Sequence, residues 1–434
     1  MSRKLVDRIA DRSARVSIIG LGYVGLPLAI EFCRAGFSVT GIDVDPAKVR
    51  QLNDGISYVE DIPNAVLQEA LGRGFRATTD YGMLAGIDCV SICVPTPLNK
   101  TKDPDMSYIL SAIDEIVKHF HRGQLIVLES TTYPGTTDEV ILPRLEGTGL
   151  HVGEDFYLAF SPERIDPGNK VFTTRNTPKI IGGVTPACTA AAQALYGTAI
   201  EQIVPVSSTR AAEMVKLLEN TFRAVNIALA NEVAIMSDKL KIDVWEVIEA
   251  AATKPFGFMP FYPGPGLGGH CIPIDPHYLS WKLKTLNYNA RFIELASDIN
   301  AKMPEYVVRR ATAILNDLQK SVNGSRILIL GASYKRDVGD LRESPALEVM
   351  NLLLEGKAIL SYHDPFIPEI RLGERTLCCV ELSAETLSAQ DLVIVVTDHA
   401  YYDMQWITDH ATQILDTRNA TRNVTTPKAT ITRL

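Results

Sequence analysis

The sequence has no long apolar stretch, no surplus of positive charge and no paired CxxC motifs. The first sixteen residues are interrupted by charges, and eighteen consecutive apolar residues occur nowhere, so we expect neither a signal peptide nor a membrane span. A formal net charge of -8 supplies no general attraction for nucleic acid. The seven cysteines are an odd number without a zinc-type pair, which predicts a reducing, cytoplasmic location and no metal site.

What is present is a chain of enzyme size. It has 434 residues, of which 46% are hydrophobic, and at roughly 150 residues per domain this predicts two or three domains. Changes of pattern along the chain favour three: a nucleotide-binding domain over 1–205, a helical domain over 206–320 and a smaller nucleotide-binding-like domain over 321–434.

The first of these regions has the pattern of an α/β fold. A buried strand from Arg15 leads through a glycine turn into a helix over about 25–36 and a second strand from Ser38 to Asp43, which is one βαβ unit. Three later apolar runs alternate with helical patterns, as a parallel sheet covered on both faces requires. These runs are Cys89 to Val94, Leu125 to Glu129 and Phe156 to Phe160, the last strand that we expect in this domain.

The glycine turn has the form of a dinucleotide-binding motif. Gly20, Gly22 and Gly25 form GxGxxG between the first strand and the helix, and Asp43 ends the next strand. Such glycines let the backbone approach a pyrophosphate at the helix N-terminus, and the acid accepts from a ribose 2'-OH. Because a carboxylate there repels a 2'-phosphate, the motif predicts NAD and not NADP.

A long helix follows the first domain. The residues from Arg210 to Leu240 contain neither Gly nor Pro and repeat apolar residues at helical spacing. About thirty helical residues span roughly 45 Å, which suits a strut between domains and a dimer surface. Lys216 and Asn220 are four apart and share a face, where they could meet a reacting oxygen or simply face solvent.

The helical region, expected to end near 320, is interrupted by a loop over 254–278. Within it, the thirteen residues from Gly264 to Pro276 contain four glycines and three prolines around Cys271. A buried structural thiol in a tight turn is the ordinary interpretation of a cysteine. A glycine-rich loop that admits a ligand favours a nucleophile here, because a thiolate is the best side-chain nucleophile near neutral pH.

Two further segments carry candidate binding residues. Glu163, in the SPERIDPG segment after the expected last strand, is either an acid/base or part of a proline-capped turn. In the third domain a strand from Arg326 and a strand ending at Asp364 repeat the opening pattern without GxGxxG. Cations between them predict a phosphate ligand other than a second NAD, with a solvated charge cluster as the alternative. These are Lys335, Arg336 and Arg342.

Taken together, these motifs resemble the UDP-glucose/GDP-mannose dehydrogenase family over nearly the whole chain. They are GLGYVG, VPTP, ESTTYPGTT, SPER, the Lys216 to Asn220 helix, GGHCIPIDP and YKRDVGDLRES, in this order. GHCIPIDP and SPERIDPGN most resemble the members that oxidise UDP-N-acetylglucosamine to its uronic acid for surface polysaccharides.

The resemblance implies two Rossmann-like domains joined by a helical domain, a homodimer or higher oligomer through the long helix, and a four-electron oxidation at C6 with two NAD in succession. The catalytic matches are Cys271 as nucleophile, Lys216 and Asn220 at the reacting oxygen, Glu163 as acid/base and Asp275 as a carboxylate assisting lysine and water. The NAD-contacting matches are Gly20, Gly22, Tyr23, Val24, Gly25, Asp43, Lys48, Thr96, Ser130, Thr131 and Arg342. The substrate-contacting matches are Glu163, Arg164, Lys216, Asn220, Tyr262, Gly264, Gly266, Gly268, Tyr334, Lys335 and Arg418.

Three departures concern the sugar. UDP-glucose enzymes often carry Lys, Glu and Arg at positions where this chain has Ile274, Pro167 and, as the nearest cation, Lys254. These changes favour a substrate with an altered 2-position. UDP-GalNAc, UDP-ManNAc and UDP-glucose remain alternatives, as do a two-electron hydroxyacid dehydrogenase and a non-catalytic NAD-sensing or assembly protein.

Overall fold

The computed structural model divides into two compact units, here called unit 1 and unit 2. Unit 1 comprises Met1–Glu219 and His277–Tyr288, and unit 2 comprises Asn220–Pro276 and Asn289–Leu434. The residues that the structure describes are 4–59, 61–99, 103–166, 168–169, 171–269 and 271–434. The three domain boundaries expected above stay a prediction.

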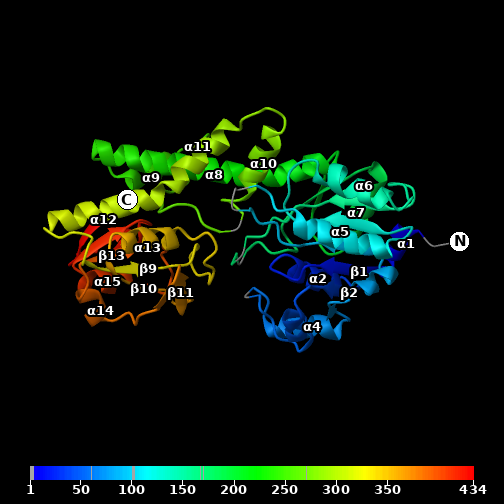
Figure 1. Cartoon of the computed structure of the whole chain (residues 1–434), viewed down its shortest axis with the longest axis horizontal. Helices are drawn as coiled ribbons and strands as arrows, with labels where there is room; N and C mark the ends of the chain where they lie inside the picture. Colours follow the sequence, from blue (N-terminus) through cyan, green and yellow to red (C-terminus); the bar gives the residue numbers. More distant parts are fainter. Residues whose placement is uncertain (1–3, 60, 100–102, 167, 170, 270) are drawn as a thin grey trace. The chain divides into compact units, whose positions relative to one another are not determined.

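Unit 1 is built on a sheet of eight strands in the order β3-β2-β1-β4-β5-β6-β7-β8 (Figure 1). The strands are β1 (Arg15–Ile19), β2 (Ser38–Ile42), β3 (Arg76–Thr78), β4 (Cys89–Ile92), β5 (Leu125–Leu128), β6 (Tyr157–Phe160), β7 (Lys179–Gly183) and β8 (Ile203–Pro205). The expected strands are therefore confirmed to within two residues at each end.

Two hydrophobic cores lie on the two faces of this sheet because neighbouring side chains of a strand point to opposite sides. In β5, Leu125 and Val127 join one core, and Ile126 and Leu128 join the other. Helices α2 and α7 contribute to the first core and α5 and α6 to the second. The helices of unit 1 that precede the long helix are α1 (Leu5–Ala10), α2 (Gly25–Arg34), α3 (Pro46–Asn53), α4 (Asn64–Gly72), α5 (Ser107–His119), α6 (Leu142–Glu146) and α7 (Pro186–Tyr196), with short turns η1 (Tyr81–Gly86) and η2 (Thr137–Ile141).

Two expectations about this sheet are wrong. The run from Phe156 to Phe160 is not the last strand, since β7 and β8 follow it. The sheet is also not wholly parallel, because β6 and β7 pair antiparallel through Phe160 and Gly182. The chain reverses at this pairing after the SPER loop, so that loop joins two neighbouring antiparallel strands.

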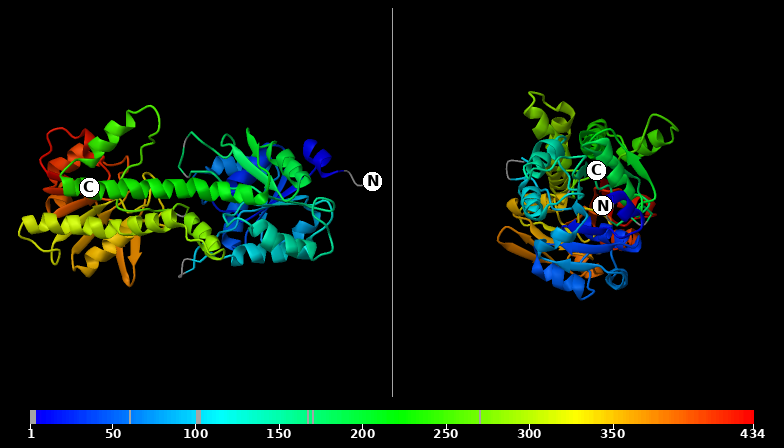
Figure 2. Two further views of the ribbon diagram at one scale, coloured as in Figure 1. Left: turned by 90° about the horizontal axis from the view of Figure 1, so that it is seen from above. Right: turned by 90° about the vertical axis from the view of Figure 1, so that its right-hand side faces the viewer.

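The long helix α8 runs over Thr209–Leu240, as the absence of Gly and Pro predicts. Figure 2 shows it in green as one unbroken helix. Three shorter helices follow it, namely α9 (Val244–Ala252), α10 (Asp275–Lys284) and α11 (Arg291–Ala301). The loop expected to reach residue 278 ends earlier, since α10 begins at Asp275; Pro276 is compatible with this start because the first helical turn needs no N-H there.

Unit 2 contains a second, wholly parallel sheet in the order β10-β9-β13-β14-β15. Along β9, Ile327 and Ile329 face one core with α12 and α13, and Leu328 and Leu330 face another with α14 and α15. The elements are α12 (Met303–Asp317), β9 (Arg326–Leu330), α13 (Pro345–Glu355), β10 (Ile359–His363), the hairpin β11 (Glu369–Leu372) and β12 (Arg375–Cys378), α14 (Ala384–Ser388), β13 (Leu392–Val395), α15 (Met404–His410), β14 (Gln413–Asp416), η3 (Ala420–Asn423) and β15 (Thr430–Arg433).

The predicted α/β class with two Rossmann-like sheets and a helical region between them in the sequence is confirmed. Within the described part of the chain, no helix combines the length and apolar character that crossing a membrane requires.

Candidate active site

The glycine turn of unit 1 joins β1 to α2. Two of its glycines pack closely against neighbouring backbone, and the third does not. A Cβ on Gly25 would lie 1.8 Å from the carbonyl oxygen of Gly20, and one on Gly20 would lie 2.5 Å from that of Cys93. By contrast, apart from the glycine itself and its two chain neighbours, no described protein atom lies within 4 Å of where a Cβ on Gly22 would stand. The turn therefore packs tightly against its own sheet and leaves Gly22 accessible to a ligand, which is what a pyrophosphate needs.

Asp43 and Lys48 lie beside this turn. The Asp43 carboxylate accepts hydrogen bonds from the N-H groups of Leu21 at 2.9 Å and Asp45 at 3.0 Å. The hydroxyl of Tyr58 donates to the carbonyl of Leu21 at 2.6 Å, and the Lys48 ammonium lies 5.5 Å from the centre of the Tyr58 ring. The structure thus brings the predicted glycines, acid and lysine together. Tyr23 and Val24 lie at the start of α2, with Tyr23 exposed.

The other predicted NAD contacts of unit 1 follow the strand ends. Ser130 donates to the carbonyl of Val94 at 2.8 Å, and the carbonyl of Thr96 accepts from the Tyr278 hydroxyl at 2.9 Å. Thr131 is half-buried next to Ser130. These residues follow the carboxyl ends of β4 and β5, where open α/β folds bind ligands.

A buried carboxylate that sequence reasoning missed holds the loop after β5. Glu213, on α8, accepts from the N-H groups of Gly135 at 2.6 Å and Thr137 at 2.9 Å, and from the Thr137 hydroxyl at 2.7 Å. Its side chain has no exposure. Burial raises the pKa of Glu213 to about 7, against these hydrogen bonds, which lower it.

This burial predicts a pH-dependent stability. Between about pH 4.5 and 7 the folded protein keeps a proton on Glu213 that the unfolded chain releases, so stability falls as pH rises through that range. Relative to Glu213→Gln, the wild type should lose about 3 kcal/mol of unfolding free energy over this interval. Thermal midpoints of both proteins at pH 5 and pH 8 measure the difference. Glu154→Gln, at an exposed position, is the control, and a constant offset between wild type and Glu213→Gln would contradict the prediction.

The SPER loop holds Glu163 in a fixed orientation. One carboxylate oxygen of Glu163 accepts from the N-H groups of Arg164 at 2.6 Å and Ile165 at 2.7 Å. Lys216 is buried and donates to the backbone carbonyl of Glu163 at 2.6 Å. Arg164 pairs with Glu219 at 2.6 Å. The structure therefore joins Glu163, Arg164 and Lys216 in unit 1; Pro167 lies outside the described residues.

Cys271 precedes the first turn of α10 in unit 2. Its carbonyl accepts from the N-H of Ile274 at 3.0 Å and from that of Asp275 at 2.8 Å, and its side chain is half-buried. Asn220 donates to the Asp275 carboxylate at 2.5 Å, and both side chains are buried. The Cys271 backbone is thus tied to the residues that open α10. The neighbouring His270 lies outside the described residues.

Three other cysteines, the buried Cys33 and Cys89 and the half-buried Cys93, have raised pKa values. Burial raises the pKa of Cys33 to about 12 and raises the pKa values of Cys89 and Cys93 as well. These thiols stay protonated near neutral pH and are poor nucleophiles. The half-buried Cys271 is the better candidate, in keeping with the glycine-rich sequence around it.

The glycine loop before Cys271 is tied down by amides that sequence reasoning also missed. The N-H of Gly264 donates to Asn231 of α8 at 2.9 Å, and Asn231 donates to Asn300 of α11 at 2.9 Å. A Cβ on Gly264 would lie 2.6 Å from a guanidinium nitrogen of Arg418. The predicted residues Gly264 and Arg418 are therefore in close approach.

The same loop packs against the predicted nucleotide-binding segment of unit 2. A Cβ on Gly268 would lie 2.6 Å from Tyr334, and the N-H of Gly269 donates to the carbonyl of Arg342 at 3.0 Å. The Arg342 guanidinium pairs with Asp340 at 2.6 Å. The remaining predicted contacts are Gly266, in a left-handed conformation, Lys335, half-buried next to Tyr334, and Tyr262, whose ring stacks on Trp245.

Asp364 is the counterpart of Asp43 in the second sheet, but protein donors occupy it. One carboxylate oxygen accepts from the N-H of Ala332 at 2.7 Å, from the N-H and hydroxyl of Ser333 at 2.9 Å, and from His399 at 3.0 Å. Although burial alone would raise the pKa of Asp364, these hydrogen bonds lower it. Asp364 is thus a structural acid; that this domain holds no second NAD stays a prediction.

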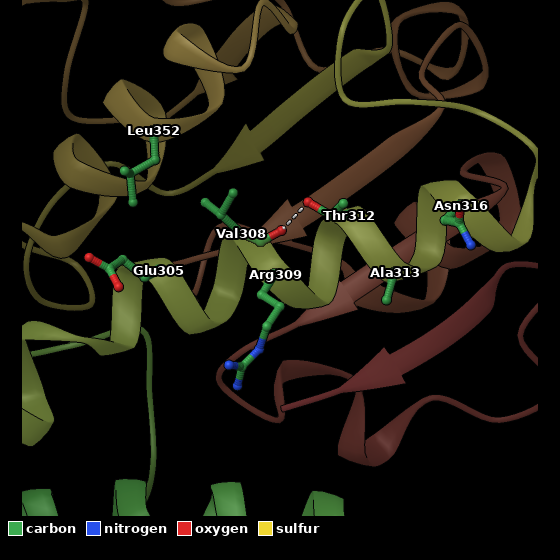
Figure 3. A pocket seen from close by; sticks show the side chains of 7 residues that line it. All are labelled: Glu305, Val308, Arg309, Thr312, Ala313, Asn316 and Leu352. Atoms are coloured by element: carbon green, nitrogen blue, oxygen red, sulfur yellow. Dashed lines mark hydrogen bonds between the residues drawn. The ribbon is translucent and has the colours of Figure 1, made fainter.

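A surface groove elsewhere on unit 2 contains no predicted site residue. Its volume is about 620 Å³, and Figure 3 shows that it follows α12. The lining residues are Glu305, Val308, Arg309, Thr312, Ala313, Asn316 and Leu352. Among the described residues, no cluster of three or more His, Cys, Asp or Glu side chains could hold a metal ion.

Comparisons with known proteins agree with this geometry. Residues 14–200 match the NAD-binding domain of the UDP-glucose/GDP-mannose dehydrogenase family, residues 210–302 its central domain and residues 328–423 its UDP-binding domain. A UDP-N-acetyl-D-glucosamine 6-dehydrogenase from Pseudomonas aeruginosa is 36% identical over 358 residues, which are 82% of this chain and 84% of that protein.

Two further relatives carry other substrate names. An NDP-N-acetyl-D-galactosaminuronic acid dehydrogenase from Ralstonia nicotianae is 35% identical over 92% of this chain and 94% of its own. The solved structure of a UDP-D-ManNAc dehydrogenase from Pyrococcus horikoshii superposes with a TM-score of 0.87 at 33% identity, covering 96% of this chain and 98% of its own. Because matches to all three family domains follow one another along the chain, the protein belongs to the UDP-glucose/GDP-mannose dehydrogenase family and is an NAD-dependent oxidoreductase.

Proposed function

We propose that this enzyme oxidises the C6 alcohol of a UDP-sugar to the carboxylic acid, with Cys271 as the covalent nucleophile. The observation that carries the proposal is the position of Cys271, half-buried ahead of α10, next in space to the hydrogen-bonded backbone of Asp275. Asp275 in turn is held by Asn220, so the thiol lies in an ordered polar environment. A two-electron alcohol dehydrogenase has no need of such a thiol.

The nucleophile explains how one site carries out two oxidations. The Cys271 thiolate adds to the C6 aldehyde to give a thiohemiacetal, whose oxidation yields a thioester. Water cleaves the thioester, which releases the acid and regenerates the thiol. Since the aldehyde stays bound to sulfur between the oxidations, it is not released as a reactive product.

Polar groups assist these steps. We assign Lys216 and Asn220 to the reacting oxygen, where a cation and an amide donor stabilise developing negative charge. Glu163 serves as acid/base, and Asp275 helps to orient the attacking water. The buried position of each of these side chains supports its role, because charges and dipoles act more strongly where water is excluded.

The glycine turn fits NAD. Gly22 is open to a ligand, and Asp43 accepts two backbone hydrogen bonds that hold its carboxylate beside the turn. NAD bound there supplies the hydride acceptor for both oxidations. We assign the other cofactor contacts to Tyr23, Val24, Lys48, Thr96, Ser130, Thr131 and Arg342.

For the nucleotide sugar we propose UDP-N-acetylglucosamine, bound by Arg164, Tyr334, Lys335, Arg418 and the glycine loop. The apolar Ile274 and the Pseudomonas aeruginosa relative support a 2-acetamido sugar. The names of the Ralstonia nicotianae and Pyrococcus horikoshii relatives make UDP-GalNAc and UDP-ManNAc the second candidates.

We also propose a homodimer, or a higher oligomer, through α8, in the cytoplasm. Large apolar side chains of α8 that are exposed in the single chain support such an interface. They include Leu229 at 55% and Leu240 at 68% exposure. The cysteine pattern supports the location.

The test is a panel of UDP-sugars with NAD. We expect UDP-N-acetylglucosamine to give the highest kcat/KM and two NADH for each sugar consumed, because the alcohol loses four electrons. Absorbance at the nicotinamide band and mass spectrometry of the acid measure both quantities. One NADH per sugar would overturn the four-electron reaction. A higher kcat/KM for UDP-ManNAc, UDP-GalNAc or UDP-glucose would overturn UDP-N-acetylglucosamine as the substrate and put that sugar in its place.

A further inference from the structure

A buried cation that the proposed reaction does not use lies next to Glu163. Lys179 opens β7, and its side chain is only 5% exposed. Its ammonium lies 2.6 Å from a carboxylate oxygen of Glu129, which follows β5, and 3.4 Å from one of Glu163. Two carboxylates thus share one ammonium inside unit 1.

Glu129 is the fixed end of this arrangement. Its side chain is fully buried, and its second oxygen accepts from the hydroxyl of Tyr196 in α7, which is also hydrogen-bonded to Ser91 in β4. Donors on β7 and α7 therefore hold Glu129, and Ser91 of β4 in turn holds the Tyr196 hydroxyl. Lys179 in turn is held by Glu129 at 2.6 Å, a closer contact than its 3.4 Å approach to Glu163.

Glu163 is the second carboxylate that this ammonium contacts. Its first carboxylate oxygen is already engaged by the N-H groups of Arg164 and Ile165, so the contact with Lys179 falls on the second oxygen. The same loop is joined to the start of β7 by Ser161, which donates to Ile180 at 2.8 Å, and by Arg164, which donates to Pro178 at 2.7 Å. The residues from Pro178 to Ile180 thus fix both the loop and its carboxylate.

The charges around this group make the ammonium hard to replace. Burial raises the pKa of Glu129, and the nearby Glu163 raises that pKa further. Lys179 lowers it but does not cancel the effect of burial. Burial alone would lower the pKa of Lys179, but Glu129 and Glu163 raise it. The cavity beside Glu163 and Lys179 has a volume of about 10 Å³, which is room for a single water. The titratable and charged groups that surround the group are Cys93, Arg164, Tyr196, Lys216 and Glu219.

We propose that Lys179 is the positioning residue for Glu163: anchored on Glu129, its ammonium fixes the direction of the carboxylate that acts as acid/base. The inference rests on the proposed function, in which Glu163 is that acid/base. It gives Lys179 and Glu129 a role in the reaction without contact to the substrate.

Replacing Lys179 by methionine tests the proposal. The variant leaves Glu129 and Glu163 as two neighbouring buried carboxylates, and like charges disfavour ionisation. We expect kcat to fall about 100-fold, as a displaced catalytic group does, with the KM for the UDP-sugar changed less than about threefold. The acidic limb of the kcat/KM profile should move to higher pH. Lys179→Arg keeps the cation, and its kcat should be at least about tenfold higher than that of Lys179→Met.

A second variant keeps the test decisive if Lys179→Met folds poorly. Glu129→Gln/Lys179→Met removes the pair together, so Glu163 no longer faces a second buried carboxylate. This double variant should regain the thermal midpoint and the NAD affinity of the wild type but not its kcat. Lys118→Met, at an exposed position, controls for the loss of one lysine.

The outcomes separate the two proposals. Wild-type kcat and an unshifted pH profile in Lys179→Met, or recovery of kcat in the double variant, would overturn the positioning role while the proposed function stands. If the double variant loses NAD affinity together with kcat, the role is structural and the inference is equally overturned. If the wild type oxidises no nucleotide sugar, the proposed function fails and this inference with it.

Discussion

The Cys271→Ser variant should produce no uronic acid above about a thousandth of the wild-type rate. A serine hydroxyl ionises far above neutral pH and is a much weaker nucleophile than a thiol, so neither thiohemiacetal nor thioester forms. The first oxidation does not need the thiol, and the variant should stop after at most one NADH per sugar. Counting NADH and detecting the aldehyde with a hydrazine reagent measure where it stops.

Cys378→Ser is the matched control, because it makes the same change at an exposed thiol of β12. It should retain wild-type turnover. Two NADH per sugar at the wild-type rate from Cys271→Ser would contradict covalent catalysis by this residue and would favour an aldehyde hydrated free in the site.

The second large effect is expected at the glycine turn, where two neighbouring alanine substitutions should fail differently. An alanine at position 22 meets no described protein atom within 4 Å, so the protein should fold with a normal thermal midpoint. Its methyl group would occupy the surface that a pyrophosphate approaches, and NAD affinity should fall at least about 100-fold. Calorimetric titration with NAD measures this loss.

Gly25→Ala should damage the fold itself. Its methyl carbon would lie 1.8 Å from the backbone oxygen of Gly20, and backbone cannot move aside as a flexible side chain can. We expect a destabilisation of more than about 4 kcal/mol, visible as an early unfolding transition of unit 1. Normal NAD affinity in Gly22→Ala would place the pyrophosphate elsewhere, and a wild-type unfolding profile in Gly25→Ala would refute the packing argument.

Sequence patterns predicted those strands and helices in which the apolar residues follow one regular pattern from end to end. The central strands β1, β4 and β5 are apolar except for Arg15, Ser17 and Ser91, and α8 has helical spacing without a break. By contrast, β7 begins with Lys179 and ends with two glycines, and β8 has three residues ending in a proline, so neither resembles a buried strand. The direction of β7 and β8 relative to β6 is set by hydrogen bonds between neighbouring strands. Such pairing leaves no periodic pattern in the sequence, so the direction could not be predicted.

The residues of the candidate site also fall into two groups, those that local sequence predicts and those that only the fold brings together. Cys271, Asp43 and the glycine turn were found because local sequence carries their geometry. Lys179 and Glu129 lie 50 residues apart, and only the fold brings them together. The sequence did hold one signal for the pair, since Glu129 ends the wholly apolar run LIVL, and a buried acid at a strand end needs a cation.

The Asp364 carboxylate, which already accepts several hydrogen bonds from the protein, limits what ligand the second sheet can be redesigned to bind. The first sheet leaves its acid at the ligand edge, and the second uses the same position to fasten Ser333 and His399 to the strand end. A designer who restored GxGxxG at residue 331 would still find no acceptor for a ribose there. Turning this half of the molecule into a dinucleotide site would require freeing Asp364 first, starting with a replacement of His399.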